Sequence, residues 1–244
     1  MGLTVHINHE AEFGELTGKY PCFGFLGQAR IPRDDDHTWR TNDRHWGYVD
    51  KTTHAVQMMV IGKTGYGKST TLNRLVGRDV FDTDAVSVCT KDLYCGMYRI
   101  DSSVPSFFMV SDLPGVGESH YADDHYYGWY RDMLQRSDLV LYVLRADQRD
   151  YAIDEMVFSN LFDSPDKKRK VVIALNYADK IEPVRRAPGL SEEQRRNLDL
   201  RAGEISRKFG VDRRDVIAYS AQDGVDFDRL IHHSAGKLRE LLAG

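Results

Sequence analysis

The sequence predicts an α/β fold in which a mainly parallel six-stranded sheet lies between two layers of helices. From residue 55 onward, short apolar runs alternate with longer amphipathic stretches, which is the pattern of strand–helix–strand units. Several apolar runs end in Gly, Asp or Asn, at the carboxyl ends of strands, where open α/β sheets bind ligands. The chain has 244 residues, which suits one such domain preceded by an extension.

The individual elements follow from the same patterns. Strands are expected where short apolar runs occur, at residues 56–61, 94–100, 107–111, 139–144, 171–175 and 216–219. Helices are expected between them, at residues 69–76, 126–136, 153–162, 192–209 and 227–242. The fourth helix should open with a capping box, because the side chains of Ser191 and Gln194 can each accept a hydrogen bond from the other residue's backbone amide.

Residues 1–54 differ from the rest of the chain and are predicted to be an N-terminal extension of unknown role, followed by a single domain at 55–244. The extension contains His6, His9, His37 and His45, an acidic run at 34–36, and little periodicity. A metal site is one interpretation. The irregular histidine spacing instead favours a polar extension packed on the domain.

Composition narrows the class of protein. Apolar residues make up 41% of the chain and charged residues 29%, which is ordinary for a folded globular protein. The formal net charge of −4 gives no reason to expect nucleic acid or an anionic membrane as the main partner. The three cysteines (Cys22, Cys89 and Cys95) lack paired spacing, and no signal peptide or membrane-spanning run is recognisable, so we expect a cytoplasmic protein with reduced thiols.

A phosphate-binding loop is the strongest motif. It matches G-x-x-x-x-G-K-[ST] between an expected strand and an expected helix. Glycines let backbone amides point at a phosphate, the lysine can reach β- and γ-phosphates, and the serine hydroxyl can ligate Mg²⁺. The loop predicts a nucleoside triphosphate but not its base, because kinases and ATPases share it. Its residues are Gly62, Lys63, Thr64, Gly65, Tyr66, Gly67, Lys68 and Ser69, followed by Thr70.

Two later segments complete a phosphate and base site. Asp112 ends a strand and is followed by a Pro-Gly turn, so its carboxylate can hold Mg²⁺ through water and the Gly115 amide can sense a γ-phosphate. Asn176 and Asp179 form an Asn-x-x-Asp motif after another strand. Asp179 can accept the two adjacent N–H donors that guanine has and adenine lacks, while Asn176 would tie this loop to the phosphate loop and contact the base.

The last expected strand ends at Ser220 and Ala221, where a backbone amide, assigned to Ala221, can donate to the guanine carbonyl oxygen. Each of these segments taken alone is a weak signal, because turns with the same residues are common. Their occurrence in this order, each at the carboxyl end of a strand, predicts a guanine-nucleotide site.

With these motifs the chain resembles the Era-like branch of the translation-factor-related P-loop GTPases, with a Ras-like G domain from about residue 55 to the end. The phosphate loop is similar to those of septins and immunity-associated GTPases. Residues 138–147 and 176–183 resemble small Era-like GTPases of bacterial genomes and prophages. The resemblance implies GTP/GDP and Mg²⁺ as cofactors, with Ser69, Thr90 and Asp112 as metal ligands and Lys68, Thr90 and Gly115 as catalytic residues. Ser87 is a weaker candidate for the role of Thr90.

Three residues depart from the family pattern. Tyr177 stands where the base motif usually has lysine, and its ring could stack near the base instead. Val116 stands where Ras-like enzymes place the glutamine that orients water. Gly65 replaces the asparagine with which some relatives hold potassium. The resemblance and these departures predict slow hydrolysis, helped by pairing of two copies across the nucleotide face or by a separate protein.

Three functions remain open at this point. The first is a nucleotide-switched regulator with slow GTP hydrolysis and an unidentified protein effector. The second is a septin-like, GTP-dependent scaffold with little turnover. The third is an ATP-using P-loop enzyme, against which Asp179 and the Ser220-Ala221 pair argue.

Overall fold

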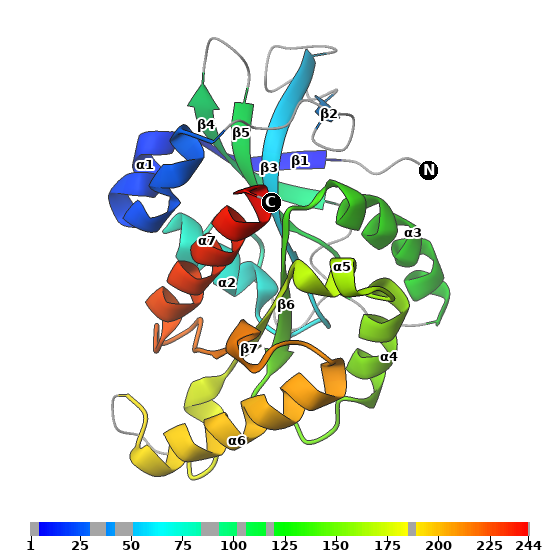
Figure 1. Cartoon of the computed structure of the whole chain (residues 1–244), viewed down its shortest axis with the longest axis vertical. Coiled ribbons are helices and arrows are strands. Elements are labelled where there is room, and N and C mark those ends of the chain that lie inside the picture. The colour runs from blue at the N-terminus through cyan, green and yellow to red at the C-terminus, as the bar shows by residue number, and fades with distance from the viewer. Residues whose placement is uncertain are drawn as a thin grey trace.

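The computed structural model describes residues 5–29, 38–41, 51–83, 93–101, 106–115, 120–184 and 189–243. From residue 106 onward, each strand is followed by one or two α-helices before the next strand begins, as the sequence predicts (Figure 1). The strands are β1 (Val5–Glu12), β2 (Thr38–Thr41), β3 (Lys51–Ile61), β4 (Leu93–Asp101), β5 (Ser106–Asp112), β6 (Leu139–Arg145), β7 (Val171–Asn176) and β8 (Val216–Ala218). The α-helices are α1 (Phe13–Lys19), α2 (Lys68–Val76), α3 (His120–Arg136), α4 (Ala152–Leu161), α5 (Pro165–Arg169), α6 (Glu192–Phe209) and α7 (Phe227–Ala243).

The strands form one sheet in the order β1-β4-β5-β3-β6-β7-β8, with β2 paired to the first half of β3. The β4–β5 and β2–β3 pairs are antiparallel and the other pairs are parallel. The mainly parallel α/β fold is therefore confirmed. The expected number of six strands is wrong, because the described residues contain eight. The two additional strands, β1 and β2, come from the N-terminal residues and lack the continuous apolar runs that mark the central strands.

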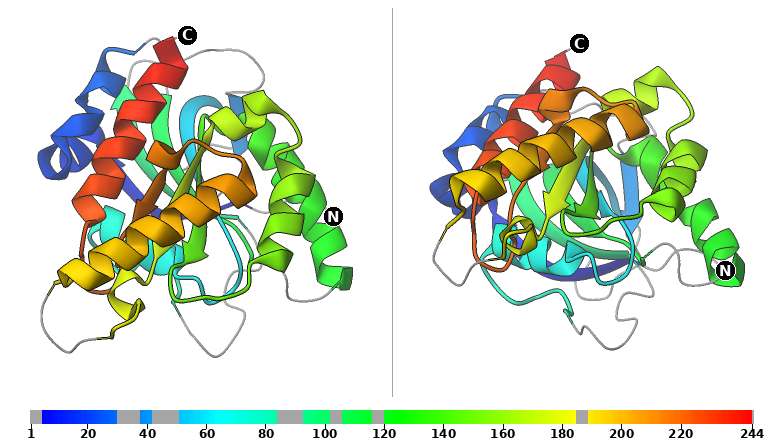
Figure 2. Two further views of the ribbon diagram at one scale, coloured as in Figure 1. Left: turned by 60° about the horizontal axis from the view of Figure 1, so that its bottom comes forward. Right: turned by 90° about the horizontal axis from the view of Figure 1, so that it is seen from below.

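Helices cover both faces of the sheet (Figures 1 and 2). Helices α1, α2 and α7 lie on one side and α3 and α4 on the other. Helix α6 contacts α4 and β8, and it opens with the predicted capping box of Ser191 and Gln194. Every residue of β5 and β7 is buried. This explains why their sequences are near-continuous apolar runs rather than alternating ones.

The described N-terminal residues are built into the sheet and its core. Strand β1 runs parallel to β4 at the end of the strand order. The buried side chains of Leu16, Phe23 and Leu26 belong to the main hydrophobic cluster. The Lys19 ammonium donates to the carbonyl oxygens of Arg74 and Leu75, at 2.7 and 3.1 Å, and so binds the C-terminal end of α2.

The described residues also bear on membrane insertion and metal binding. No helix in the described ranges is long and apolar enough to cross a membrane. Within the same ranges, no group of three or more His, Cys, Asp or Glu side chains is placed to hold a metal ion. His37, His45 and the acidic run at 34–36 lie outside the described residues.

Candidate functional site

The phosphate loop joins the end of β3 to the start of α2, at the centre of the sheet. Gly65 and Gly67 have φ angles of 78° and 85°, a left-handed conformation that glycine adopts without strain. A Cβ on Gly67 would lie 2.4 Å from the Asn176 side-chain nitrogen. The loop therefore needs glycine at this position both for its backbone angle and for the close approach of Asn176.

Ser69 and Asp112 meet beside this loop. The Ser69 hydroxyl donates to Asp112 Oδ2 at 2.6 Å, and Asp112 is 1% exposed. The β3–β5 register places Asp112 opposite Val60, so the carboxylate reaches the first turn of α2. A hydroxyl and a carboxylate are the hard oxygen donors that Mg²⁺ prefers, so this pair fits the expected ion. Thr90, the third expected ligand, lies outside the described residues, as does Ser87.

Lys68 and Gly115 lie against the same loop. The buried Lys68 ammonium donates to the Lys63 carbonyl oxygen at 3.3 Å. A Cβ on Gly115 would lie 2.0 Å from the Thr64 hydroxyl oxygen and 2.5 Å from the Thr64 backbone nitrogen. Only glycine permits this approach, which brings the segment after β5 onto the phosphate loop. Val116 lies beyond the described residues.

Asn176 joins the phosphate loop to the loop after β8. Its side-chain nitrogen donates to the Tyr66 carbonyl oxygen at 3.0 Å, and its side-chain oxygen accepts from the Ala221 amide at 2.9 Å. Asn176 is 3% exposed. The Ala221 amide, which the sequence assigns to the guanine carbonyl, is thus engaged by Asn176 here and holds the loop in place. Ser220 stabilises the same loop by accepting from the Asp223 amide at 3.1 Å.

Arg74 of α2 is a further support for this loop. Its guanidinium donates to the carbonyl oxygens of Ala221 and Gln222, at 2.9 and 3.2 Å. Its guanidinium carbon also lies 5.5 Å from the centre of the Phe227 ring. Nothing in the sequence singles out Arg74, because its partners lie almost 150 positions later in the chain.

Asp179 and Tyr177 follow Asn176 on the base side of the site. The Asp179 carboxylate is 12% exposed and lies 2.9 Å from the Lys180 ammonium. The Tyr177 hydroxyl donates to the Gly65 carbonyl oxygen at 3.2 Å. Tyr177, Thr70 and Ala221 line a cavity of about 820 Å³ that opens beside α2. The Asn176 hydrogen bonds thus bring the expected base loop, phosphate loop and last loop together, and Tyr177 and Ala221 from two of these loops line the cavity.

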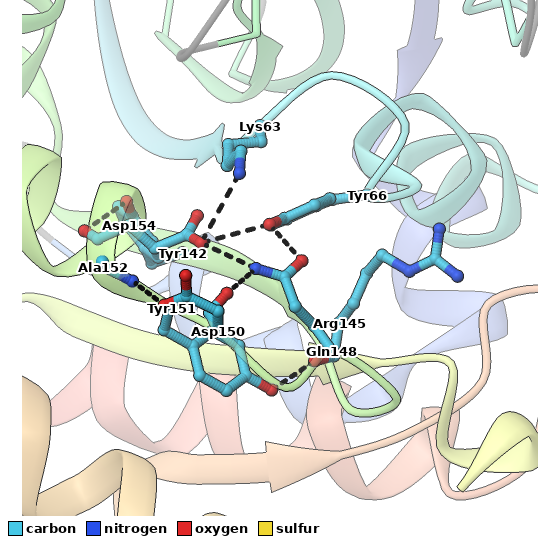
Figure 3. Close-up of polar contacts among 9 residues, drawn as sticks. All are labelled: Lys63, Tyr66, Tyr142, Arg145, Gln148, Asp150, Tyr151, Ala152 and Asp154. Carbon is cyan, nitrogen blue, oxygen red and sulfur yellow. Dashed lines mark hydrogen bonds and ion pairs between the residues drawn. The ribbon is translucent and has the colours of Figure 1, made fainter.

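A second polar network, centred on Asp154 of α4, contacts Lys63 and Tyr66 of the phosphate loop (Figure 3). The Tyr66 hydroxyl lies 2.5 Å from Gln148 Oε1 and 3.1 Å from Asp154 Oδ2. The Gln148 side-chain nitrogen donates to the same carboxylate oxygen at 3.3 Å, and the Lys63 ammonium lies 4.0 Å from it. Burial raises the pKa of Asp154, an effect that Lys63, Tyr66 and Gln148 oppose. Sequence reasoning missed Asp154 and Gln148, because an acidic residue in a helix carries no local mark of burial.

Comparison with known proteins identifies a GTPase domain in this chain. A family model described as "50S ribosome-binding GTPase" matches residues 57–177. The uncharacterized protein YfjP of Escherichia coli is 34% identical over 152 residues, which cover 62% of this chain and 51% of YfjP. GTPase Era of Aquifex aeolicus is 24% identical over 175 residues, covering 70% of this chain and 53% of Era. The chain thus spans about half the length of these relatives.

Solved structures show the same fold. Era in complex with MgGDPNP and a segment of 16S ribosomal RNA has a TM-score of 0.60 at 22% identity, covering 76% of this chain and 57% of Era. A variant of Toc33 from Arabidopsis thaliana has a TM-score of 0.59 at 18% identity, covering 93% of this chain and 91% of Toc33. The family match, the Era relative and the geometry of the loops agree. Through this domain the chain belongs to the Era-like P-loop GTPases.

Proposed function

We propose that the chain binds GTP and GDP with Mg²⁺, hydrolyses GTP to GDP and phosphate, and acts as a nucleotide-switched regulator. The observation that carries this proposal is the position of Asn176. By bonding to both Tyr66 and Ala221, it joins the phosphate loop and the base-reading loops into one unit. A site that senses the base and the terminal phosphate together is what a guanine-nucleotide switch requires.

The phosphate end of the site follows from Lys68, Ser69 and Asp112. The Lys68 ammonium and the loop amides would bind the β- and γ-phosphate oxygens and stabilise charge that develops there. The Ser69 hydroxyl would ligate Mg²⁺ directly and Asp112 through water, with Thr90 as the third protein group. Bound Mg²⁺ neutralises charge on the triphosphate. The Gly115 amide, held against Thr64, would report whether a γ-phosphate is present.

The base end follows from Asp179, which would accept the ring N–H and the exocyclic amine of guanine. Isothermal calorimetry of the purified protein with GTP, GDP and ATP in the presence of Mg²⁺ tests this assignment. We expect GTP and GDP to bind far more tightly than ATP. Equal affinity for ATP and GTP would reject the guanine site and favour an ATP-using enzyme.

We further propose that hydrolysis by the monomer is slow and accelerates when two copies pair across the nucleotide face. Valine at position 116 cannot orient water, and Gly65 has no side chain to hold potassium. In other GTPases, an arginine supplied to the site by a second protein raises the rate of GTP hydrolysis by a factor of about 10³–10⁵. Support comes from a structural neighbour, because dimerization is important for the GTPase activity of the chloroplast translocon component Toc33.

Specific GTPase activity measured against protein concentration tests the pairing. Activity per molecule should rise with concentration if pairing completes the site. Fast turnover that stays constant down to nanomolar protein, without a partner, would show that one chain suffices. A septin-like scaffold is the alternative function, and it predicts little turnover together with GTP-dependent particles larger than a dimer, which light scattering with GTP and GDP would detect.

The partner in the cell is proposed to be a protein effector in the cytoplasm. An Era crystal structure contains ribosomal RNA, whereas the net charge of −4 here gives no general attraction to nucleic acid. Purification of partners on protein loaded with a non-hydrolysable GTP analogue distinguishes a protein effector from an RNA.

A further inference from the structure

Tyr177 lies beneath the guanidinium of Arg145, the last residue of β6. The guanidinium carbon is 4.1 Å from the centre of the Tyr177 ring. Strand register explains the contact, because Arg145 pairs with Asn176 on the adjacent strand β7. The Arg145 side chain also points away from the Asp154 network (Figure 3), so it serves a different part of the site.

Asp147 holds Arg145 in this position. Arg145 Nε donates to Asp147 Oδ1 at 3.0 Å, and Nη2 donates to Oδ2 at 2.7 Å. A two-bond contact of this kind fixes the orientation of the guanidinium plane as well as its distance. The Arg145 backbone is held too, since its carbonyl oxygen accepts from the Tyr151 hydroxyl at 2.5 Å. Contacts to both its guanidinium and its backbone therefore hold Arg145 above the Tyr177 ring.

Tyr177 itself lines the cavity beside α2 and has a restricted conformation. Its φ angle is 62°, a left-handed value that is costly for an aromatic residue and persists only where surrounding contacts impose it. One such contact is its hydrogen bond to Gly65. Tyr177 lines the cavity, whereas Arg145 is not among the lining residues. Arg145 therefore reaches the cavity through the Tyr177 ring that it contacts.

We propose that Arg145 and Asp147 are positioning residues that hold Tyr177 as a wall for the guanine base. Where the base motif of relatives usually has lysine, this chain has an aromatic ring bonded to the phosphate loop, with the positive charge of Arg145 behind it. This inference rests on the proposed guanine-nucleotide site and adds two residues to it. Because Arg145 already provides the charge, lysine at position 177 would place two cations side by side and weaken the site.

The test is a cycle of four proteins: the unaltered chain, Arg145→Ala, Tyr177→Lys and the double variant. Affinity for fluorescent GDP is measured, together with the melting temperature of each nucleotide-free protein. Arg145→Ala should weaken GDP binding about 2- to 30-fold, the range expected for loss of a cation from an aromatic face. Tyr177→Lys should weaken it as well. The double variant should bind more tightly than Tyr177→Lys, because removing Arg145 relieves the repulsion.

Arg149→Ala is the matched control, since Arg149 is an exposed arginine four positions along the chain and lies outside the stack. It should bind GDP as the unaltered protein does. Unchanged GDP affinity in Arg145→Ala, or losses in the double variant that merely add, would overturn the positioning role. A general loss of folding would lower every melting temperature and could not produce the improvement in the double variant. If the unaltered protein binds no GDP, the proposed function itself fails, which is a different result from either of these.

Discussion

Asp154 attaches two residues of the phosphate loop to α4, and it has no exposed surface. Replacing it with alanine leaves the Tyr66 hydroxyl with Gln148 and removes the acid beside the Lys63 ammonium. Loss of a partner by a buried polar group costs about 1–3 kcal/mol. We therefore expect the Asp154→Ala protein to unfold at a lower urea concentration and to release GDP faster.

The control for this substitution is Asp163→Asn, since Asp163 lies just beyond the end of α4, with 60% of its side chain exposed. It should change neither urea unfolding nor GDP release. Asp154→Asn should be intermediate, because an amide oxygen still accepts from Tyr66 but carries no charge for Lys63. If GDP release stays unchanged while stability falls, the network contributes to folding alone.

Asp179 is the residue on which discrimination of the base is proposed to depend. Exchanging it for asparagine replaces one acceptor oxygen by a donor, so the base edge must then offer an acceptor. Xanthine offers a carbonyl oxygen where guanine has its amine. We expect the Asp179→Asn protein to bind xanthosine diphosphate more tightly than guanosine diphosphate, as measured by competition of each against a fluorescent nucleotide. Retained preference for guanosine diphosphate would assign discrimination to another residue.

At the scale of elements, Asp215 anchors helix α7 to the segment before β8. His233 and Lys237 of α7 lie 2.9 and 2.5 Å from its carboxylate, which is 9% exposed. Burial alone would raise the pKa of Asp215, but the hydrogen bonds from His233 and Lys237 outweigh it and hold the pKa below its usual value. Because folding lowers the pKa of Asp215, its carboxylate stabilises the fold at pH values above its unfolded pKa, about 3.9. This stabilisation is lost as the pH falls through the lower pKa of the folded state.

The Asp215→Asn protein should therefore be less stable than the unaltered protein at neutral pH, by about 1–3 kcal/mol. The difference between the two should shrink as pH falls below about 4. Urea unfolding across this pH range measures both effects. Asp199→Asn provides the comparison, because Asp199 pairs with Arg213 in solvent, where an ion pair contributes little. A difference that stays constant with pH would show that Asp215 acts by shape rather than charge.

At the scale of the whole molecule, we propose that residues 5–29 are a structural part of the GTPase domain. Leu16, Phe23 and Leu26 are at most 2% exposed and pack in the main core. Burying each such side chain is worth about 1.5–3 kcal/mol, which in sum approaches the whole stability of an ordinary domain. A chain without residues 1–29 should therefore melt at a much lower temperature or fail to fold.

Removal of residues 1–4 alone provides the control, since it leaves β1 and the three core side chains in place. Calorimetric melting of the two shortened proteins beside the full chain measures the effect. Equal melting temperatures for all three would show that the domain folds from residue 55 onward. The N-terminal residues would then be an attached extension, as their composition suggests.

The central strands could be predicted because a parallel strand covered on both faces is a continuous apolar run, a signal contained within the strand itself. Strand β1 could not, because it lies at the end of the strand order, where exposed positions such as Asn8 and Glu10 are polar. Its place in the sheet depends on pairing with β4, more than 80 positions away.

The sequence by itself determined the loops that are proposed to meet the nucleotide, because each needs particular residue types within a few positions. Glycine at 65 and 67 and the Asn176-x-x-Asp179 motif are local requirements of backbone conformation and hydrogen bonding. Only the tertiary structure decided which residues hold those loops in place. Arg145 meets Tyr177, and Asp154 meets Tyr66, through the order of strands β3, β6 and β7. No local pattern encodes that juxtaposition, since side chains distant in sequence become neighbours only when the sheet forms.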